Sequence, residues 1–201
     1  TVPPKRNPLA SVHGLTNTLP THRNLMSDNV ITIRVYDAPC GRLVLGSFDD
    51  SLCMCDWLTG QRHDLIVRRL SRNLGACFAE GTSPLLETAV AQLDEYFSGR
   101  RRVFDLPLLF TGTEFQKAVW QRLMTIPYGE TISYGAMAAG LGIPKAVRAV
   151  ANANGANAIS IFAPCHRVIG ADRSLTGYGG GLAVKRYLLD LEHGIASISF
   201  S

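Results

Sequence analysis

The sequence predicts a mixed α+β protein with two domains, a small sheet domain followed by a mainly helical domain. β-branched runs separated by turn residues fill the region after residue 29, whereas apolar residues at helical spacing dominate from residue 113 onward. With 201 residues, of which 46% are hydrophobic and 18% charged, the chain is long enough to bury a substantial core. This composition excludes wholesale disorder, and no apolar run approaches the ~20 residues of a membrane span.

The first domain is expected over residues 29–108, after a flexible tail over residues 1–28 that lacks apolar periodicity. A β-branched, partly alternating run begins at Val30, and turn residues at 38–41 and 49–51 divide the following sequence into short segments. This pattern predicts a three-stranded antiparallel sheet. The expected strands are 30–36, 42–47 and 52–58.

Two helices are predicted after these strands. Leucine and isoleucine residues fall at helical spacing over residues 61–77. A second helix begins after Ser83, a favourable cap, with Pro84 in its first turn, and it runs to Phe97 before a glycine.

The second domain is expected over residues 109–201. Thr113 caps its first helix and Ser133 caps a short one, and the glycine- and proline-containing turn at 142–144 leads to a further helix over residues 145–153. Two short helices across such a turn predict a helix-turn-helix, a common DNA-binding unit. An ordinary pair of packed antiparallel helices fits the same pattern.

The helix over residues 145–153 favours DNA as the partner. Apart from Lys145 and Arg148 its residues are mostly small, so it is slim enough to press on a minor groove about 6 Å wide. Arg148 could then enter the duplex in place of an extruded base. Residues 112–201 carry 8 basic and 5 acidic side chains, whereas residues 28–111 carry 9 basic and 11 acidic ones. The excess of positive charge in the second domain favours that domain as the one that binds a polyanion.

Cys165-His166 is the candidate reactive centre. A thiol, an imidazole and a later carboxylate, Glu192, are the groups needed to form and hold a thiolate. Two unrelated packed residues would produce the same dipeptide. The five cysteines are odd in number and irregularly spaced, which predicts a reducing compartment.

Several sequence strings occur in order in the second half of the chain. They are Phe115-Gln116-x-x-Val119-Trp120, Ile126-Pro127-x-Gly129-Glu130-Thr131, Ser133-Tyr134, Pro144-Lys145-Ala146-Val147-Arg148-Ala149-Val150, Pro164-Cys165-His166-Arg167-Val168-Ile169 and Gly177-Tyr178-Gly179-Gly180-Gly181 followed by Lys185. Through them, residues 112–194, about 40% of the chain, resemble the catalytic domain of the O6-alkylguanine-DNA alkyltransferases, the methylated-DNA–protein-cysteine methyltransferases. By pattern alone, the first half is similar to that family's ribonuclease-H-like domain, and the second is expected to be winged-helix-like.

The resemblance implies DNA repair by direct reversal. Cys165 would accept a methyl or larger alkyl group from O6 of guanine once and irreversibly, and the sequence leaves open whether O4-alkylthymine is also a substrate. His166 would draw the thiol proton through a turn and a bridging water, while Glu192 holds the imidazole tautomer. The Tyr134 hydroxyl would donate to N3 of the base, and Asn157 would join the DNA-binding helix to the active-site turn.

The resemblance also implies that the base is flipped out from the minor groove, with Arg148 intercalating and Tyr134 crowding the 3′ phosphate. The carbonyls of Cys165 and Val168 would accept the exocyclic amine, and the backbone N–H of Gly179 would face O6. The remaining implied contacts are Lys145, Ala149 and Ser133 for DNA, with Val168, Tyr178, Gly179 and Lys185 in the substrate pocket.

We expect no cofactor and no metal ion. Cys53-x-Cys55 with His63 is the one candidate metal cluster, and it is more typical of packed core residues. The expected partner is double-stranded DNA carrying O6-alkylguanine, without membrane association, bound by a monomer that could assemble cooperatively. The expected location is the cytoplasm and nucleoid of a prokaryote, or the nucleus of a eukaryote.

Two other functions stay open on the residues alone. A cysteine hydrolase also uses cysteine, histidine and a carboxylate, but it needs no helix-turn-helix, and turnover of a simple ester would identify it. A non-catalytic DNA-lesion binder would share the helix and the pocket. Relatives of that kind lack the cysteine that is present here as Cys165.

Overall fold

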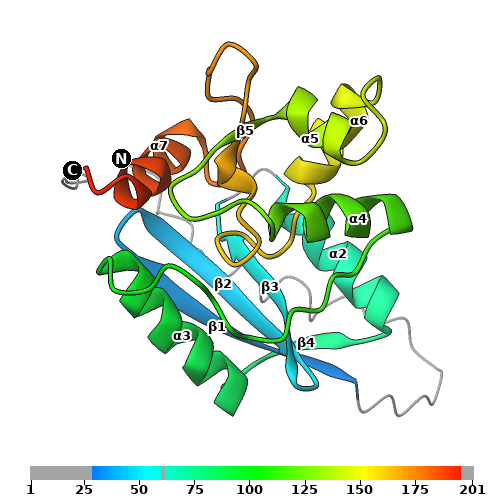
Figure 1. Cartoon of the computed structure of the whole chain (residues 1–201). Helices are drawn as coiled ribbons and strands as arrows, with labels where there is room; N and C mark the ends of the chain where they lie inside the picture. Colours follow the sequence, from blue (N-terminus) through cyan, green and yellow to red (C-terminus); the bar gives the residue numbers. More distant parts are fainter. Residues whose placement is uncertain (1–28, 60–61, 196–201) are drawn as a thin grey trace, which may run out of the picture.

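The computed structural model describes residues 29–59 and 62–195, so the predicted flexible tail, residues 1–28, lies outside the described residues (Figure 1). The mixed α+β prediction is confirmed. Along the chain the elements are β1 (Val30–Ala38), β2 (Gly41–Phe48), β3 (Ser51–Trp57), α2 (His63–Leu74), β4 (Cys77–Glu80), α3 (Pro84–Phe97), α4 (Glu114–Leu123), β5 (Ile132–Ser133), α5 (Tyr134–Gly140), α6 (Val147–Gly155), the 3-10 helix η1 (Cys165–Arg167), β6 (Val168–Ile169) and α7 (Leu182–Glu192).

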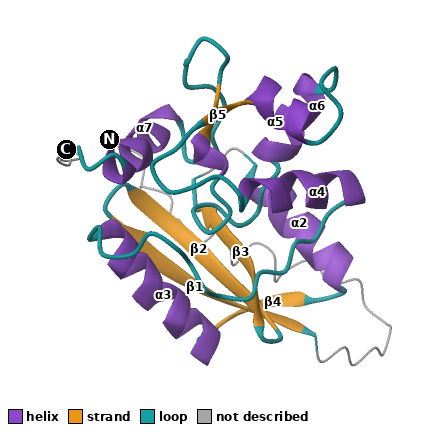
Figure 2. Cartoon of the chain, viewed as in Figure 1, coloured by secondary structure: helices purple, strands orange, loops and turns teal. Residues whose placement is uncertain are grey.

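A four-stranded sheet in the order β3-β2-β1-β4 organises the first half of the chain. The pairs β1–β2 and β2–β3 are antiparallel, as predicted, and β4 runs parallel to β1. Helix α3 packs along the sheet (Figure 2), where the Tyr36 hydroxyl donates to Asp94 at 2.8 Å and the Tyr36 ring stacks on Phe97. Ser83 caps this helix as predicted, by accepting a hydrogen bond from the Leu86 amide.

The prediction of three strands is wrong, because the helix expected over residues 61–77 ends early. Gly75 adopts a left-handed conformation (φ 60°, ψ 33°) at the C-terminus of α2 and terminates the helix. Cys77, expected inside that helix, instead begins β4, whose register pairs it with Val30. Four residues show too little alternation to reveal a strand, so β4 depends on its tertiary pairing with β1.

The connection between the two halves and a segment of the second half cover the outer edge of β3. The Leu52 amide donates to the Pro107 carbonyl at 2.9 Å, and the Leu109 amide donates to the Leu52 carbonyl at 2.9 Å. Further along the strand, the Cys55 amide donates to the Ala158 carbonyl at 2.8 Å and the Ser160 amide donates to the Cys55 carbonyl at 2.7 Å. The edge is therefore protected from pairing with another chain, and β3 is tied to the segment that leads to Cys165.

The helices of the second half lie over one end of the sheet (Figure 1). Thr113 forms a capping box with Gln116 at the start of α4, and Ser133 caps α5, both as predicted. Helices α5 and α6 pack together across a turn that contains Gly142 (φ 75°). The predicted helix-turn-helix arrangement is present.

The structure of the second half departs from the expected one in three places. The helix expected over residues 145–153 begins at Val147, because the Ala146 amide donates to the Ile143 carbonyl at 2.8 Å and so leaves Lys145 in the preceding turn. Helix α7 was not predicted, although Val184 and Leu188 are separated by the four residues typical of one helix face. The two-residue strands β5 and β6, which pair in parallel, were also not predicted.

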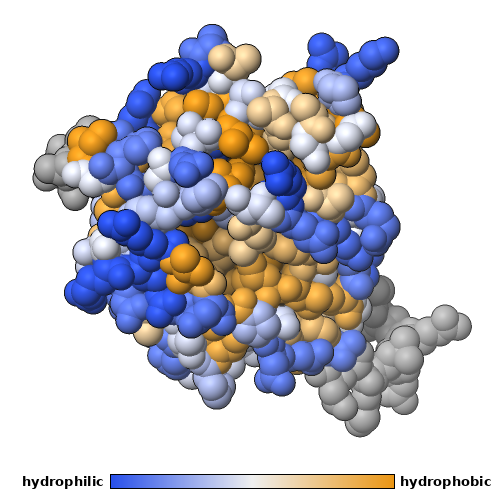
Figure 3. All heavy atoms as spheres, in the orientation of Figure 1, coloured by the Kyte–Doolittle hydropathy of each residue, from blue (hydrophilic) through white to orange (hydrophobic). Residues whose placement is uncertain are grey.

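Buried apolar residues from both halves form one continuous core. The division into domains at residues 108 and 109 stays a prediction. Figure 3 shows apolar atoms exposed among charged ones on the face seen in Figure 1, including a patch below α4. No helix within residues 29–59 or 62–195 is both long and apolar enough to cross a bilayer.

Two side chains from other elements donate hydrogen bonds to carbonyls at the C-terminal end of helix α6. Trp120 of α4 is 1% exposed, and its indole N–H donates to the Ala153 carbonyl at 2.8 Å. Arg69 of α2 lies 5.1 Å over the Trp120 ring and donates to the Ala156 carbonyl at 2.8 Å. The C-terminal carbonyls of α6 are thus held by one residue from each half of the molecule.

Replacing Trp120 by phenylalanine tests this anchor. Trp120→Phe should lower the free energy of unfolding by about 2 kcal/mol, because it removes the buried indole hydrogen bond to the Ala153 carbonyl, which keeps only the Ala156 amide as a donor, and opens a small cavity. Urea unfolding followed by circular dichroism measures this change. Phe115→Leu, on the exposed side of the same helix, should cost less than half as much, and equal losses would contradict the anchor.

Candidate active site

Cys165 lies on a single turn of 3-10 helix, where Cys165, His166 and Arg167 are all buried. The Arg167 amide donates to the Pro164 carbonyl at 3.0 Å and closes this turn, after which Val168 enters β6. A tight turn lets adjacent side chains serve one site, which an extended strand would not. The turn that the resemblance implied is therefore present at Cys165 and His166.

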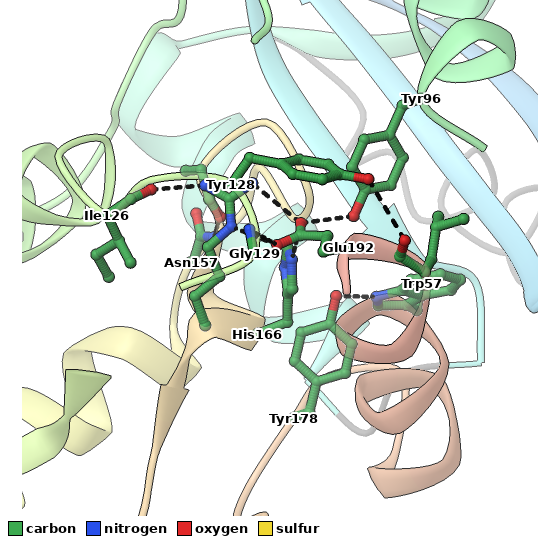
Figure 4. A network of polar contacts seen from close by, with 12 residues as sticks. Trp57, Tyr96, Ile126, Tyr128, Gly129, Asn157, His166, Tyr178 and Glu192 are labelled. Carbon is green, nitrogen blue, oxygen red and sulfur yellow. Dashed lines mark hydrogen bonds and ion pairs between the residues drawn. The ribbon is translucent and has the colours of Figure 1, made fainter. Parts of the chain in front are cut away.

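Glu192, at the end of α7, is the centre of the polar network drawn in Figure 4. One carboxylate oxygen, Oε1, accepts from His166 Nε2 at 2.7 Å, from the Tyr96 hydroxyl at 2.8 Å and from Arg167 Nη2 at 3.0 Å. The other, Oε2, accepts from Arg167 Nε at 2.9 Å and from the Gly129 amide at 3.1 Å. Five donors thus surround a buried carboxylate and fix its position.

These contacts settle the charge of the carboxylate. Burial alone would raise the pKa of Glu192, but the hydrogen bonds and charges of His166 and Arg167 hold that pKa well below its usual range. Arg167 also donates to the Ile126 carbonyl at 2.7 Å and lies 5.7 Å from the centre of the Tyr128 ring. Glu192 and Arg167 therefore form a buried ion pair with multiple hydrogen bonds.

The His166 imidazole is neutral, so it is able to act as a base. Its side chain is fully buried, and burial lowers the pKa of its imidazole although Glu192 favours the charged ring. In the neutral ring Nε2 carries the hydrogen that Glu192 accepts, so Nδ1 keeps its lone pair. Nδ1 is buried and has no hydrogen-bond partner among the described residues, which leaves it free to accept a proton.

The thiol of Cys165 is protonated at rest. Burial raises the pKa of Cys165, while a hydrogen bond from Asn157 and the positive charge of Lys185 oppose this rise. Lys185 is fully buried and donates to the Val168 carbonyl at 2.7 Å and to the Thr176 carbonyl at 2.8 Å. Burial lowers the pKa of Lys185 to about 8. Forming the thiolate therefore requires a base to take its proton.

Two buried asparagines connect α6 with the Cys165 turn. Asn157 donates from Nδ2 to the Ala163 carbonyl at 2.8 Å and accepts from the Ile159 amide at 3.0 Å, which is the connection that the resemblance implied. Asn154 donates to the Cys165 carbonyl at 3.4 Å and to the Tyr134 hydroxyl at 3.5 Å. The helix that carries Arg148 and the turn that carries Cys165 are thus linked directly.

Two cavities meet at this site. The larger, of about 610 Å³, lies between α6 and residues 176–179, and its lining includes Tyr134, Arg148 and Arg62. The smaller, of about 10 Å³, is lined by Cys165 and by Asn154 among others. The lining of both cavities includes residues 177–179. Tyr178 is held there by the Trp57 indole, which donates to its hydroxyl at 3.2 Å.

Six of the predicted site residues line the two cavities, namely Tyr134, Arg148, Asn157, Cys165, Tyr178 and Gly179. His166, Glu192, Val168 and Lys185 are buried and belong to neither lining, and three further residues lie away from the cavities. Exposed Lys145 and Ala149 lie on the surface at the start of α6, and Ser133 uses its side chain to cap α5. The Val168 carbonyl, expected to meet the substrate, accepts a hydrogen bond from buried Lys185.

Sequence reasoning missed five residues of this region. Arg167, Tyr96 and Asn154 contact the predicted site residues, and Asp56 and Trp57 form the wall beside Gly179. Arg167 directly follows the Cys165-His166 pair, which was a usable signal. The other four come from α3, α6 and β3, and no spacing connects them to Cys165.

The candidate metal cluster does not form as a set. Cys53 and Cys55 are fully buried in the core, whereas His63 hydrogen-bonds through Nδ1 to Asp56 Oδ2 at 2.9 Å. Over the part of the chain that the structure describes, no three histidine, cysteine, aspartate or glutamate residues are grouped to hold a metal ion.

Comparison with known proteins covers both halves of the chain. Residues 31–110 match the family description "6-O-methylguanine DNA methyltransferase, ribonuclease-like domain", and residues 114–194 match "6-O-methylguanine DNA methyltransferase, DNA binding domain". A methylated-DNA–protein-cysteine methyltransferase of Mycobacterium leprae is 46% identical over 163 residues, which cover 81% of this chain and 93% of the relative. One of Methanosarcina acetivorans is 40% identical over 158 residues, covering 79% and 96%.

A solved structure shows the same arrangement. The structure of Mycobacterium tuberculosis OGT in complex with DNA is similar to this chain with a TM-score of 0.71 and 42% sequence identity. The match covers 84% of this chain and 96% of that one. The similarity therefore extends over both halves of the chain.

The buried network predicts how stability depends on pH. The native pKa values of His166 and Glu192 are both lowered, so the unfolded chain binds more protons than the native one below their ordinary pKa values of about 6.5 and 4.5. The free energy of unfolding should therefore fall on acidification, first through the titration of His166 and then through that of Glu192. Each proton contributes no more than about 1.4 kcal/mol per pH unit.

Urea unfolding at pH 7.5 and pH 5.5 measures the first of these steps. His166→Gln removes the titrating ring and should reduce the loss of stability between the two pH values. An unchanged loss in this variant would mean that another group is responsible.

Proposed function

The chain belongs to the O6-alkylguanine-DNA alkyltransferase family, and from this premise we propose that it repairs DNA by moving an alkyl group from O6 of guanine to Cys165. The observation that carries the proposal is the His166–Glu192 contact of 2.7 Å beside buried Cys165, which lines the smaller of the two cavities that α6 borders. The protein is then a methylated-DNA–protein-cysteine S-methyltransferase that acts once.

The reaction begins with proton transfer from Cys165. His166 Nδ1 takes the thiol proton through a bridging water, because Nδ1 is the unpartnered basic atom of a buried neutral imidazole. The imidazolium that forms keeps its Nε2–H contact with Glu192, whose negative charge stabilises it. Arg167 keeps Glu192 ionised and oriented throughout.

The thiolate then attacks the alkyl carbon in line with the O6–carbon bond. The S–C bond forms as the O6–carbon bond breaks, and the electron pair of the broken bond stays on the guanine. Donors near the base lower the barrier by stabilising this charge, and the Tyr134 hydroxyl and the Gly179 amide have that role. The product thioether has no low-energy route back, so each protein molecule reacts once.

Access to O6 requires the nucleotide to leave the duplex. The cavity of about 610 Å³ lies in the size range of small-molecule sites and is large enough for an extruded purine. Arg148 is exposed at its edge on α6, where it would fill the space that the base vacates. Lys145, Ala149 and Ser133 would lie along the DNA backbone beside it.

The partner is double-stranded DNA, and the alkylated base is the specific ligand. We infer that the protein acts as a monomer able to assemble cooperatively on DNA, without cofactor or metal. It would act wherever the DNA lies, in the nucleoid or the nucleus. Contacts to the minor groove and phosphates read little sequence, so affinity should depend mainly on salt concentration.

Mass spectrometry of the intact protein tests the transfer. Incubation with duplex DNA containing O6-methylguanine should add one methyl group, located on Cys165 by peptide mapping. Cys165→Ala should bind the same duplex within about threefold of wild type and gain no mass. An unmodified wild-type protein, or transfer in the variant, would reject the proposal.

The role of Arg148 is tested by comparing two substrates. Arg148→Ala should slow methyl transfer from duplex DNA at least tenfold while changing the reaction with free O6-benzylguanine less than twofold, because the free base needs no extrusion. Single-turnover rates give both values. Arg72→Ala, at the exposed end of α2, serves as the control and should change neither rate. Equal slowing with both substrates would exclude an intercalating role.

A further inference from the structure

The small cavity beside Cys165 has a polar wall that the transfer reaction does not use. Its volume is about 10 Å³, which is the room of one water-sized group. Its lining includes Cys165 together with Asn154, Asp56 and Ser160, all of them buried. A group on the Cys165 sulfur, or on the alkyl carbon approaching it, lies next to these side chains.

Asn154, one of the residues that line this cavity, has an unpaired acceptor. The Cys165 carbonyl can only accept a hydrogen bond, so the amide nitrogen of Asn154, which lies 3.4 Å from it, must be the atom that faces it. This contact fixes the amide orientation and turns Oδ1 away from the Cys165 carbonyl. Asn154 is 2% exposed, and its Oδ1 has no hydrogen-bond partner among the described residues. A buried amide oxygen in this position favours a ligand that can donate.

Asp56 provides a second acceptor on the same wall. It follows Cys55, whose backbone pairs with the segment before Cys165, so β3 places Asp56 beside the active-site turn. Oδ2 of Asp56 is bonded to His63 at 2.9 Å, while Oδ1 faces the Gly179 side, where an added Cβ would lie 3.8 Å from it. Arg62 is the one basic residue in the cavity lining, and it is exposed at the rim.

We propose that this cavity is a subsite for a hydroxyl group on the transferred alkyl chain, so that 2-hydroxyethyl groups are preferred over apolar groups of the same size. The inference rests on the proposed alkyl transfer and adds a substrate class to it. A hydroxyl on the second carbon of the alkyl group donates to Asn154 Oδ1 and fills the space of one water. An n-propyl group of equal length leaves the Asn154 acceptor unpaired, which raises the barrier to its transfer.

The test compares three duplexes that differ only in the O6 substituent, which is methyl, 2-hydroxyethyl or n-propyl. Single-turnover rates with wild-type protein should show 2-hydroxyethyl transferred at least fivefold faster than n-propyl. Asn154→Leu removes the amide with little change in volume, and the ratio of the two rates should fall to within twofold of one. The ratio is the informative quantity, because a general disturbance of the Cys165 turn slows both substrates alike.

The methyl substrate separates the two proposals. If wild-type protein transfers methyl but transfers 2-hydroxyethyl and n-propyl at nearly equal rates, the subsite is overturned and the alkyltransferase function stands. If it transfers no methyl, both proposals are overturned. A wild-type preference that persists in folded Asn154→Leu would also overturn the subsite.

A second variant tests the acceptor character of the wall without altering Asn154. A carboxymethyl group has the size of the 2-hydroxyethyl group but carries an anion, which Asp56 repels. Wild-type protein should transfer carboxymethyl at least tenfold more slowly than 2-hydroxyethyl, and Asp56→Asn should narrow this gap at least threefold. Equal rates in wild type, or an unchanged gap in the folded variant, would contradict the proposed wall.

Discussion

The buried carboxylate of Glu192 is the interaction on which the rest of the site depends. A charge removed from water is costly unless donors replace its hydration, and here side chains or backbone from α3, η1 and the segment before β5 surround it. Tyr96 reaches it from the sheet half of the molecule, so the site is complete only when both halves are packed together. The chemistry at Cys165 is thus built on an interface within the fold.

Glu192 fixes the orientation and the tautomer of His166, while the basicity of the imidazole has another source. By accepting the Nε2 hydrogen of His166, it selects the tautomer whose Nδ1 lone pair is available. Because burial, and after it the positive charge of Arg167, lowers the pKa of His166, the imidazole stays neutral in its buried position and is able to take a proton. The orientation of the base and its basicity therefore have different sources.

Helix α6 joins recognition to chemistry through its two faces. Its exposed face carries Arg148, while Asn154 on the buried face contacts the Cys165 carbonyl and the Tyr134 hydroxyl. Trp120 and Arg69 hold the carbonyls at its C-terminal end. A displacement of α6 on DNA would therefore also move the turn that carries Cys165, because the two are in direct contact.

Local signals were enough to predict the α+β class and the capped helices after Ser83, Thr113 and Ser133, and the Cys165-His166 string was enough to propose the reactive pair. Only the tertiary structure decided that β4 joins the sheet and that Asp56 and Tyr96 reach the site. These depend on contacts between residues far apart in the chain. Local patterns contain no information about which distant strand or helix will supply the donor to a buried charge.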